Sequence, residues 1–558
     1  MSSSARVGLL GGGQLGRMLI QAANRRLIQV NVLDKPGCSA KQIAAHDGHV
    51  DGSFKDPSAV KELAASCDIL TVETEHVDTQ SLEDLASQIR IEPSWKTLRT
   101  IQNKFVQKEH LIKYGVDVVD SMDLEGKGAD GLGEAGLTFG YPFLLKSKTE
   151  AYDGRGNILV KKESEIDAAM EAMGGRPLYA ERLVDFKLEL AVMVVKTKDN
   201  MLTFPTTETV HENSICRYTY TPPRDVSKPI QQKAQALAKK AAGAFEGKGV
   251  IGVEMFLLKD DTLLVNEIAP RPHNSGHYTI EACPMSQFEA HLCAILDHPI
   301  HAKSLRLREP AIMLNILGGQ DPGSHLRVAD EARLCPNGTI HLYGKGDATP
   351  GRKMGHITIT APTMHEAEAE AQHLIDFIGT KRGVERPISP KVPPRIAVIM
   401  GSKSDLSVMN PCFDLLKEFK LDYEPRITSA HRTPDVLRDF AMTAADKGLK
   451  VIIAGAGGAA HLPGMCAAWT QLPVIGVPIK AGHFQGMDAL LSMTEMPLGE
   501  PVATVGVNKA GNAVLLAIRM LASSDDELAS RLKAWMAFRE EQVKETDTAL
   551  QAEHFTPQ

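Results

Sequence analysis

Residues 252–277 have the sequence GVEMFLLKDDTLLVNEIAPRPHNSGH, and this stretch decides how the surrounding chain folds. Apolar runs flank the aspartates at 260 and 261, so the pattern predicts an antiparallel hairpin whose turn is centred on them. In that register Glu254 lies directly opposite Glu267. The same register predicts two apolar pairs on that side of the hairpin, Phe256 with Val265 and Leu258 with Leu263.

Opposed carboxylates repel each other unless a cation lies between them. Two carboxylates, completed by phosphate oxygens and water, suit Mg2+ better than zinc, so we expect Glu254 and Glu267 to hold magnesium. Asn266 adjoins Glu267 but points to the other face of a regular strand, so it joins the site only if the strand bends locally. The alternative interpretation is two exposed acids on a twisted edge strand.

A second chemical signal lies upstream, in residues 142–160 (PFLLKSKTEAYDGRGNILV). Lys146 lies on a predicted strand that leads into the glycine-rich loop YDGRG. A cation beside a backbone rich in N–H donors is what a triphosphate requires, and such a loop can close over a nucleotide. The alternative is a surface hairpin with a solvated lysine and arginine.

The first hundred residues alternate short strands with helical stretches, which predicts a doubly wound α/β unit. The stretch GLLGGGQLGR, residues 8–17, has glycines at positions 11, 13 and 16 and precedes an amphipathic helix. Its N–H groups favour a phosphate, and Asp34 could reach a ribose hydroxyl, as in a dehydrogenase that binds a dinucleotide. The alternative is a glycine turn that opens any parallel α/β domain.

Composition limits the class of protein. A chain of 558 residues with 43% hydrophobic and 23% charged residues predicts a soluble globular protein. Its length suggests about three or four domains. The net charge of -7 and the lack of basic blocks argue against a nucleic-acid or membrane-surface binder. The eight cysteines lack metal-ligand spacing, and no signal peptide or membrane-length apolar run is visible, so we expect a cytoplasmic protein.

A proline-rich stretch divides the chain. Four prolines fall between Pro387 and Pro394, where they cannot sustain a helix or an inner strand. Beyond them, strands alternate with helical stretches, which predicts a parallel sheet with a site at the carboxyl ends of its strands. Three loops are expected to converge at that site, namely residues 401–405 (GSKSD), 429–433 (SAHRT) and 455–464 (GAGGAAHLPG).

The side chains of these loops suit a ribonucleotide. The serine hydroxyls and Arg432 suit a phosphate, and Asp405 suits ribose hydroxyls. Glycine and alanine let the backbone approach a ligand closely. His431 and His461 are the only evident proton-transfer groups, although a histidine in such a loop is as often a structural hydrogen-bonding group.

The motifs GGGQLGRM, TVETEHV, YDGRG, ERLVDFKLELAV, VNEIAPRPHNSGH and GRKMGH together resemble those of the ATP-grasp carboxyaminoimidazole ribonucleotide synthetases of purine biosynthesis. This resemblance covers the first 385 residues and implies no hydride chemistry. It implies ATP contacts at Lys104, Lys146, Tyr152, Gly154, Gly156, Glu181, Glu189, His211, Asn266 and Glu267, with Mg2+ held by Glu254 and Glu267. Around the ribonucleotide and bicarbonate it implies Glu73, Tyr152, Arg155, Arg271 and Arg352, with Lys353, Asp153 and His273 as catalytic residues.

The part after the prolines is similar to the aminoimidazole ribonucleotide carboxylases or mutases of the same pathway, through MGSKSD, SAHRTP, AGAGGAAHLPGM, LPVIGVP and MPLGEPVATV. The resemblance implies His431 as the general acid/base. It implies ribonucleotide contacts at Ser402, Asp405, Ser429, Arg432, Gly457 and His461. The stretches 480–497 and 505–521 depart from the usual pattern and leave the lid and the subunit contacts open.

Together the two halves resemble the fungal-type phosphoribosylaminoimidazole carboxylases. The implied fold is an ATP-grasp architecture (a Rossmann-like pre-ATP-grasp domain, ATP-grasp domains and a small C-terminal subdomain) followed by a doubly wound, flavodoxin-like parallel sheet. The expected boundaries are 1–100 (pre-ATP-grasp), 101–300 (ATP-grasp), 301–383 (a small β-rich subdomain), 384–394 (linker) and 395–558 (carboxylase or mutase).

The resemblance implies ATP and Mg2+ as cofactors, bicarbonate as co-substrate, no NAD, pyridoxal phosphate or biotin, and a homo-octamer formed through the C-terminal domain. It implies conversion of aminoimidazole ribonucleotide to carboxyaminoimidazole ribonucleotide in two steps. Three alternatives remain at this point. They are an NAD-dependent dehydrogenase, a carboxylase that uses carbon dioxide directly with an N-terminal scaffold, and a non-catalytic nucleotide-binding or assembly protein.

Overall fold

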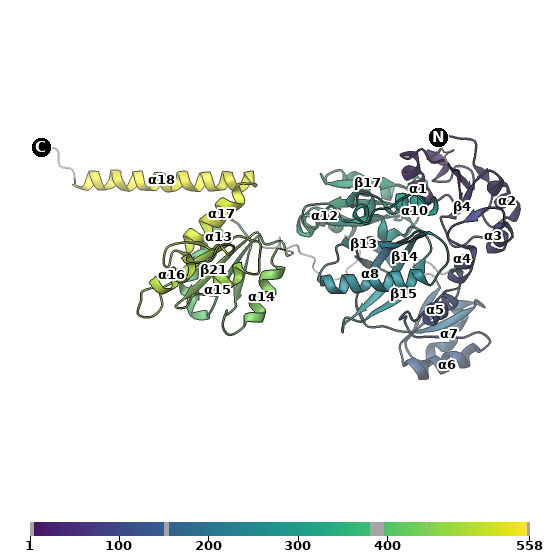
Figure 1. Cartoon of the computed structure of the whole chain (residues 1–558), viewed down its shortest axis with the longest axis horizontal. Helices are drawn as coiled ribbons and strands as arrows, with labels where there is room; N and C mark the ends of the chain where they lie inside the picture. The colour runs from purple at the N-terminus through teal and green to yellow at the C-terminus, as the bar shows by residue number, and fades with distance from the viewer. Residues whose placement is uncertain (1–4, 150–155, 380–394, 446, 555–558) are drawn as a thin grey trace. The chain divides into compact units, whose positions relative to one another are not determined.

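The computed structural model describes residues 5–149, 156–379, 395–445 and 447–554. The chain forms two compact units, residues 1–383 and 384–558, which are described separately below (Figure 1). The expected linker, residues 384–394, lies outside the described residues. None of the described helices is long and apolar enough to cross a membrane.

The N-terminal unit begins with a five-stranded parallel sheet in the order β3-β2-β1-β4-β5. Its apolar strands are covered by α1 and α10 on one face and by α2, α3 and α4 on the other, which confirms the predicted doubly wound arrangement. The strands are β1 (Val7–Leu10), β2 (Val30–Asp34), β3 (Val50–Asp51), β4 (Ile69–Val72) and β5 (Arg90–Ile91). The helices are α1 (Gln14–Asn24), α2 (Pro57–Ala65), α3 (Thr79–Leu85), α4 (Trp95–Gln102) and α10 (Gln287–Ile295).

A four-stranded antiparallel sheet in the order β6-β9-β7-β8 follows, and α6 and α7 pack on it. The helix α5 (Lys104–Lys113) begins where the Asn103 side chain accepts hydrogen bonds from the next two free backbone N–H groups. The elements of this sheet are β6 (Ser121–Asp123), α6 (Gly128–Phe139), β7 (Phe143–Ser147), β8 (Asn157–Val160), α7 (Ile166–Met173) and β9 (Leu178–Arg182).

The largest sheet has nine strands in the order β15-β14-β10-β12-β13-β16-β18-β17, with β11 paired to β10. The helix α8 covers one face of its β10-β14-β15 part, and α11 and α12 pack on β16 and β18. Because β13 pairs with β16, the boundary expected near residue 300 falls within one continuous sheet. The elements are β10 (Phe186–Lys196), β11 (Met201–Thr203), β12 (Thr207–Glu212), β13 (Ile215–Thr221), α8 (Lys228–Gly243), β14 (Gly249–Leu258), β15 (Leu263–Ala269), α9 (Thr279–Ala282), β16 (Ala311–Leu317), α11 (Ser324–Ala332), β17 (Gly338–Leu342), β18 (Lys353–Thr360) and α12 (Met364–Gly379).

The C-terminal unit is a five-stranded parallel sheet in the order β20-β19-β21-β22-β23. Alternate residues of its strands pack against α13, α17 and α18 on one face and against α14, α15 and α16 on the other. The predicted doubly wound sheet is therefore confirmed. Its elements are β19 (Ile396–Met400), α13 (Leu406–Glu418), β20 (Tyr423–Ile427), α14 (Pro434–Thr443), β21 (Val451–Gly457), α15 (Leu462–Ala467), β22 (Val474–Ile479), α16 (Met487–Thr494), β23 (Ala503–Thr504), α17 (Ala510–Ala522) and α18 (Asp526–His554).

Candidate active site

The strands β14 and β15 form the predicted hairpin, and Glu254 lies opposite Glu267 as expected. The two predicted apolar pairs are wrong by one residue, because Phe256 faces Leu264 and Leu263 faces Leu257. The turn closes between Leu258 and Thr262, where the Leu258 N–H donates to the Thr262 carbonyl over 2.8 Å. A β-bulge next to Glu254 then absorbs one residue of β15 and restores the opposition of the two glutamates.

The bulge also supplies the local bend on which the involvement of Asn266 depends. Val265 and Ile268 both pack in the core beneath α8, although three positions separate them. In a regular strand two residues three positions apart face opposite ways, so the bulge leaves Asn266 and Glu267 together on the opposite, more open face. An amide oxygen and two carboxylates therefore share one face, which is a donor set that suits Mg2+.

Lys104, at the start of α5, binds this carboxylate pair. Its Nζ donates to Glu267 Oε2 over 3.0 Å. Burial lowers the pKa of Lys104, but the charge of Glu267 and the hydrogen bond to it outweigh burial and raise the pKa overall. Within the described residues no three His, Cys, Asp or Glu side chains are grouped to hold a metal, so phosphate oxygens or water would have to complete a metal site here.

Glu181, at the end of β9, lies between two lysines. It forms ion pairs with Lys146 of β7 and with Lys108 of α5, and the Lys108 Nζ lies 2.8 Å from Glu181 Oε2. Burial raises the pKa of Glu181, yet the charges of both lysines lower it overall, so the carboxylate is ionised. The motifs indicated Lys146 and Glu181 but missed Lys108. Its position four residues after Lys104, on the same face of a predicted helix, was the available signal.

Glu189 and His211 come from the neighbouring strands β10 and β12. The His211 Nδ1 lies 3.1 Å from Glu189 Oε2. Burial lowers the pKa of His211, but the hydrogen bond and charge of Glu189 raise it overall. The structure thus brings together two residues that the resemblance assigned to ATP.

Arg271, which follows β15, is paired with Glu75 after β4. Its Nε donates to Glu75 Oε2 over 2.7 Å and its Nη2 donates to Oε1 over 3.2 Å, which is a bidentate contact. Burial raises the pKa of Glu75, but the guanidinium lowers it overall to about 2. The sequence indicated Arg271 and missed Glu75, whose only signal was the second acid of TVETEHV.

His273 lies beside Glu254 of the opposed pair. The His273 Nδ1 contacts the Ser275 hydroxyl at 2.8 Å and lies 3.5 Å from Glu254 Oε1. Burial lowers the pKa of His273 to about 4, so the ring is neutral at pH 7. The charge of Lys353 also acts to lower the pKa of His273 and of His211. Arg352 precedes Lys353 and contacts the Lys345 carbonyl at 3.5 Å.

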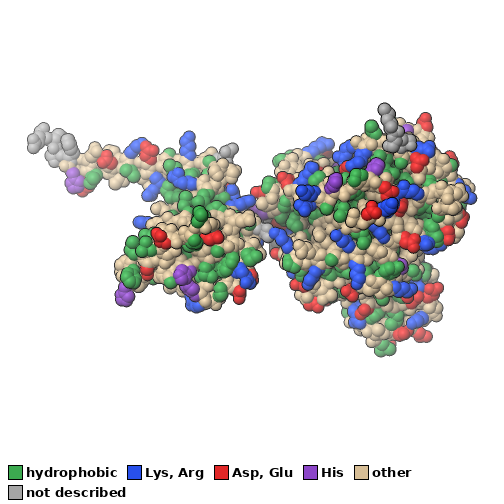
Figure 2. Space-filling view, in the orientation of Figure 1, with side chains coloured by type: hydrophobic (Ala, Val, Ile, Leu, Met, Phe, Trp, Pro, Cys, Tyr) green, Lys and Arg blue, Asp and Glu red, His purple; other side chains and the backbone are tan. Residues whose placement is uncertain are grey.

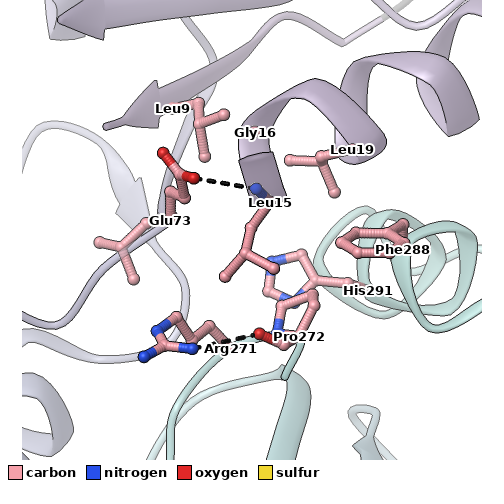
Figure 3. Close-up of a pocket in the computed structure, with 10 residues that line it drawn as sticks. Leu9, Leu15, Gly16, Leu19, Glu73, Arg271, Pro272, Phe288 and His291 are labelled. Carbon is pink, nitrogen blue, oxygen red and sulfur yellow. Dashed lines mark hydrogen bonds between the residues drawn. The ribbon is translucent and has the colours of Figure 1, made fainter. Parts of the chain in front are cut away.

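The glycine turn before α1 holds the protein's own carboxylates. Glu73 accepts a hydrogen bond from the Leu15 N–H over 2.9 Å (Figure 3). It also accepts one from the Gly13 N–H, and the Gly12 N–H donates to Asp34 Oδ2 over 2.7 Å. These N–H groups are donors that a dinucleotide phosphate would use, and here they bind the protein's own carboxylates. Glu73 also lines a cavity of about 10 Å³ together with Arg271, room for roughly one water molecule.

Four of the predicted residues, Tyr152, Asp153, Gly154 and Arg155, lie outside the described residues. Gly156, which follows them, has a φ of +82° and accepts a hydrogen bond at its carbonyl from the Ser147 N–H over 2.8 Å. This bond joins the glycine-rich stretch to the strand that carries Lys146.

In the C-terminal unit, three loops meet at the carboxyl ends of β19, β20 and β21, as predicted. The His431 Nε2 lies 2.8 Å from the His461 Nδ1, with the two rings edge to face. The Arg432 guanidinium donates to the Gly401 carbonyl over 3.2 Å and to the Ser429 hydroxyl over 3.4 Å. Both histidines are exposed, so a ligand can reach them.

The remaining predicted residues surround this point. The Ser402 hydroxyl accepts a hydrogen bond from the Ser404 N–H, and burial raises the pKa of Asp405. Gly457 ends β21, where an added Cβ would lie 3.0 Å from both the Ala481 Cβ and a backbone carbonyl. Any larger residue would therefore push the loop that carries His461 away from its neighbour.

Comparison with known proteins accounts for nearly the whole chain. The ribonucleotide synthetase preATP-grasp domain matches residues 4–102, the ATP-grasp domain residues 109–288, the phosphoribosylaminoimidazole carboxylase C-terminal domain residues 311–370, and AIR carboxylase residues 395–542. The glycine turn thus belongs to the domain that precedes the ATP-grasp domain.

Whole-chain relatives match both halves. Phosphoribosylaminoimidazole carboxylase from Schizosaccharomyces pombe is 48% identical over 98% of this chain and 97% of its own length. The Saccharomyces cerevisiae protein of the same name is 46% identical over 97% and 96%. The crystal structure of N5-carboxyaminoimidazole synthase from Aspergillus clavatus with ADP and 5-aminoimidazole ribonucleotide is 59% identical, covers 68% of this chain and 100% of that one, and has a TM-score of 0.67. The chain therefore belongs to the phosphoribosylaminoimidazole carboxylases, bifunctional enzymes of purine biosynthesis that join an ATP-dependent carboxyaminoimidazole ribonucleotide synthase half to an aminoimidazole ribonucleotide carboxylase half.

Proposed function

We propose that the residues described above carry out two consecutive steps. The N-terminal half transfers a carboxyl group from bicarbonate to the exocyclic amine of aminoimidazole ribonucleotide at the cost of ATP. The C-terminal half moves that group to the adjacent ring carbon. The opposed Glu254–Glu267 pair beside Lys104 carries the first assignment. The related Aspergillus enzyme, with ADP and the ribonucleotide bound, supports it.

In the N-terminal half, Glu254, Glu267 and Asn266 would hold Mg2+, and the metal would neutralise the charge of the transferred phosphoryl group. Lys104 and Lys146 contact the phosphates. Lys104 supplies an ammonium group beside Glu267 of the opposed pair, and Lys146 supplies one beside Glu181. Gly154 and Gly156 supply backbone donors in the loop over the phosphates. Glu189 and His211 hold the rest of the nucleotide, and Glu181 acts on it through Lys146, with which it pairs.

The reaction begins when a bicarbonate oxygen attacks the γ-phosphorus and ADP leaves, which gives carboxyphosphate. Loss of phosphate releases carbon dioxide, and the amine nitrogen bonds to its carbon and loses a proton. Arg271 stabilises the anionic oxygens, while neutral His273 can accept a hydrogen bond or a proton beside it. Lys353 and Asp153 complete the catalytic group. Glu73, Tyr152, Arg155 and Arg352 position the ribonucleotide.

In the C-terminal half, Ser402, Ser429 and Arg432 bind the phosphate and Asp405 binds the ribose, with Gly457 leaving room for the ligand. The nitrogen–carbon bond of the carbamate breaks as the amine nitrogen takes a proton from His431, and the carbon dioxide so released forms a carbon–carbon bond at the adjacent ring position. The ring hydrogen then leaves as a proton to His431, which restores aromaticity. His461 contacts the carboxylate or the ring next to His431.

The substitution Glu267→Gln tests the metal pair. It removes one negative ligand, so we expect it to abolish ATP hydrolysis in the full chain and to leave conversion of added carbamate unchanged. The control is Glu171→Gln, at an exposed position of α7, which should keep both activities. Normal ATP hydrolysis by Glu267→Gln would overturn the assignment.

The exposed apolar side chains of the C-terminal unit support a homo-octamer formed through that unit. Hydrophobic side chains are visible on its surface (Figure 2), and Phe484 and Leu498 are among the large exposed ones. Light scattering should give about eight times the chain mass of 60.5 kDa. A monomer at micromolar concentration would contradict this proposal.

The eight cysteines, all buried free thiols, support a reducing compartment, and we place the protein in the cytoplasm. Imaging of a C-terminally tagged chain tests this. An organellar signal would contradict it.

A further inference from the structure

Glu181 is a buried carboxylate that pairs with two lysines, which is one cation more than its single negative charge requires. Its residue is 1% exposed, and its two carboxylate oxygens contact different ammonium groups, that of Lys146 at Oε1 and that of Lys108 at Oε2. A buried carboxylate needs one compensating cation to remain ionised. The second lysine therefore leaves this group with a net positive charge in a buried position.

The two lysines differ in what they can reach. The Lys108 side chain is 3% exposed and lies on the buried face of α5, beside Glu181. The Lys146 side chain is 13% exposed and lies on the strand that leads into the glycine-rich stretch. Lys146 is the more exposed of the two lysines, so its ammonium group can turn toward a ligand while Lys108 stays paired with Glu181.

We propose that Lys108 is a positioning residue of the nucleotide site: it neutralises Glu181 so that Lys146 can leave that carboxylate and pair with a phosphate of ATP. This inference rests on the proposed function, in which Lys146 contacts the phosphates. Without Lys108, Lys146 could not pair with Glu181 and with a phosphate of ATP at the same time. Either Lys146 stays with Glu181 and does not reach the phosphate, or it leaves a buried carboxylate without a cation.

Lys148 provides a matched comparison. It is 3% exposed, and its Nζ lies 5.5 Å from the centre of the Phe105 ring of the same helix α5. It also pairs with two carboxylates, those of Asp123 and Glu125. Those carboxylates are solvent-exposed, so water can hydrate them when Lys148 is removed. Loss of Lys148 therefore leaves no buried carboxylate that would hold another lysine in its place.

The test measures steady-state ATP hydrolysis with the full chain in the presence of ribonucleotide and bicarbonate. For Lys108→Met we expect the KM for ATP to rise about tenfold or more, with a smaller fall in kcat, because the defect lies in nucleotide binding. Lys108→Arg should restore the KM to within about threefold, and Lys148→Met should leave it unchanged. Denaturant unfolding of the full chain, followed by circular dichroism, reports whether the N-terminal unit of each variant is intact.

A double variant separates this role from simple packing. Glu181→Gln removes the charge that would hold Lys146, so Lys108→Met combined with Glu181→Gln should bind ATP more tightly than Lys108→Met alone. A packing role predicts that the second substitution adds to the damage. An unchanged KM in Lys108→Met, an equal rise in Lys148→Met, or a double variant no better than Lys108→Met would each overturn the proposal.

Lys146→Met distinguishes this proposal from the function on which it rests. If Lys146→Met loses ATP hydrolysis while Lys108→Met binds ATP normally, only the positioning role is wrong. If Lys146→Met hydrolyses ATP normally, the phosphate contact and the positioning role are both wrong.

Discussion

Ion pairs between distant parts of the chain hold the charged side chains of the N-terminal site. Arg271 is fixed by Glu75, 196 positions away, and Lys104 by Glu267, 163 positions away. Each contact keeps a long side chain in one orientation and compensates its burial. A ligand anion that enters this site therefore meets oriented cations, although the protein as a whole is acidic.

The Glu75–Arg271 pair predicts an acid sensitivity. The pKa of folded Glu75 is about 2, below its usual 4.5, so the carboxylate stabilises the fold above pH 4.5 and this contribution is lost as the pH falls towards 2. Glu75→Gln should therefore cost about 3 kcal/mol at pH 7, and less at pH 3.5. Denaturant unfolding at both pH values measures the difference. An equal cost at pH 7 and 3.5 would show that the charge contributes nothing.

His431 should show the clearest loss of chemistry. His431→Asn keeps the size and polarity of the side chain, so we expect ribonucleotide binding to persist while carboxylation falls by about two or more orders of magnitude. ATP hydrolysis should be unchanged. His461→Asn is the control, since a contact residue should weaken binding more than it slows turnover. The reverse pattern would mean that His461 is the acid/base.

At the scale of the element, the β-bulge in β15 explains which predictions held. Alternation of apolar residues predicts a hairpin and its approximate turn, and it placed Glu254 opposite Glu267. It could not locate the bulge, because a bulge depends on packing against α8 and on the turn geometry. For the same reason the apolar pairs were wrong by one residue, while Asn266 gained the orientation that a regular strand denies it.

Other elements show the same limit. The parallel sheets and the three converging C-terminal loops follow from strand and loop patterns along the chain. The roles of Glu75 and Lys108 could not be predicted from the sequence, because a local pattern does not show which distant residue neutralises a buried charge. The sequence predicted that the glycine turn begins a helix. It did not predict that the anion bound there is the carboxylate of Glu73, 60 positions from Gly13.

The contact at this turn makes Gly13 necessary. An added Cβ would lie 2.6 Å from Glu73 Oε1, so Gly13→Ala should displace the carboxylate and cost about 1–3 kcal/mol of unfolding free energy. Gly133→Ala in α6 is the control, because an added Cβ there meets no atom within 4 Å. It should be neutral or gain up to about 1 kcal/mol. Denaturant titration that finds equal stabilities for both variants would contradict the role of Gly13.

At the scale of the whole molecule, each unit has a core of its own. The C-terminal sheet buries apolar residues of its own unit on both faces. A fragment beginning at Pro393 should therefore fold and convert carbamate to the carboxylated product without ATP. Circular dichroism and a carbamate assay check both points. A fragment that stays insoluble, or that needs ATP, would contradict the division of labour.

Product analysis of the full chain tests the central claim, that one half makes the carbamate with ATP and the other moves its carboxyl group. The chain is given aminoimidazole ribonucleotide, ATP and 13C-bicarbonate at low concentration, each omitted in turn, and the products are followed by NMR. We expect one ADP, one phosphate and one labelled C-carboxylated product per turnover, and no product without ATP. His431→Asn should still release ADP and phosphate but form no C-carboxylated product. Equal product formation with and without ATP would contradict the account.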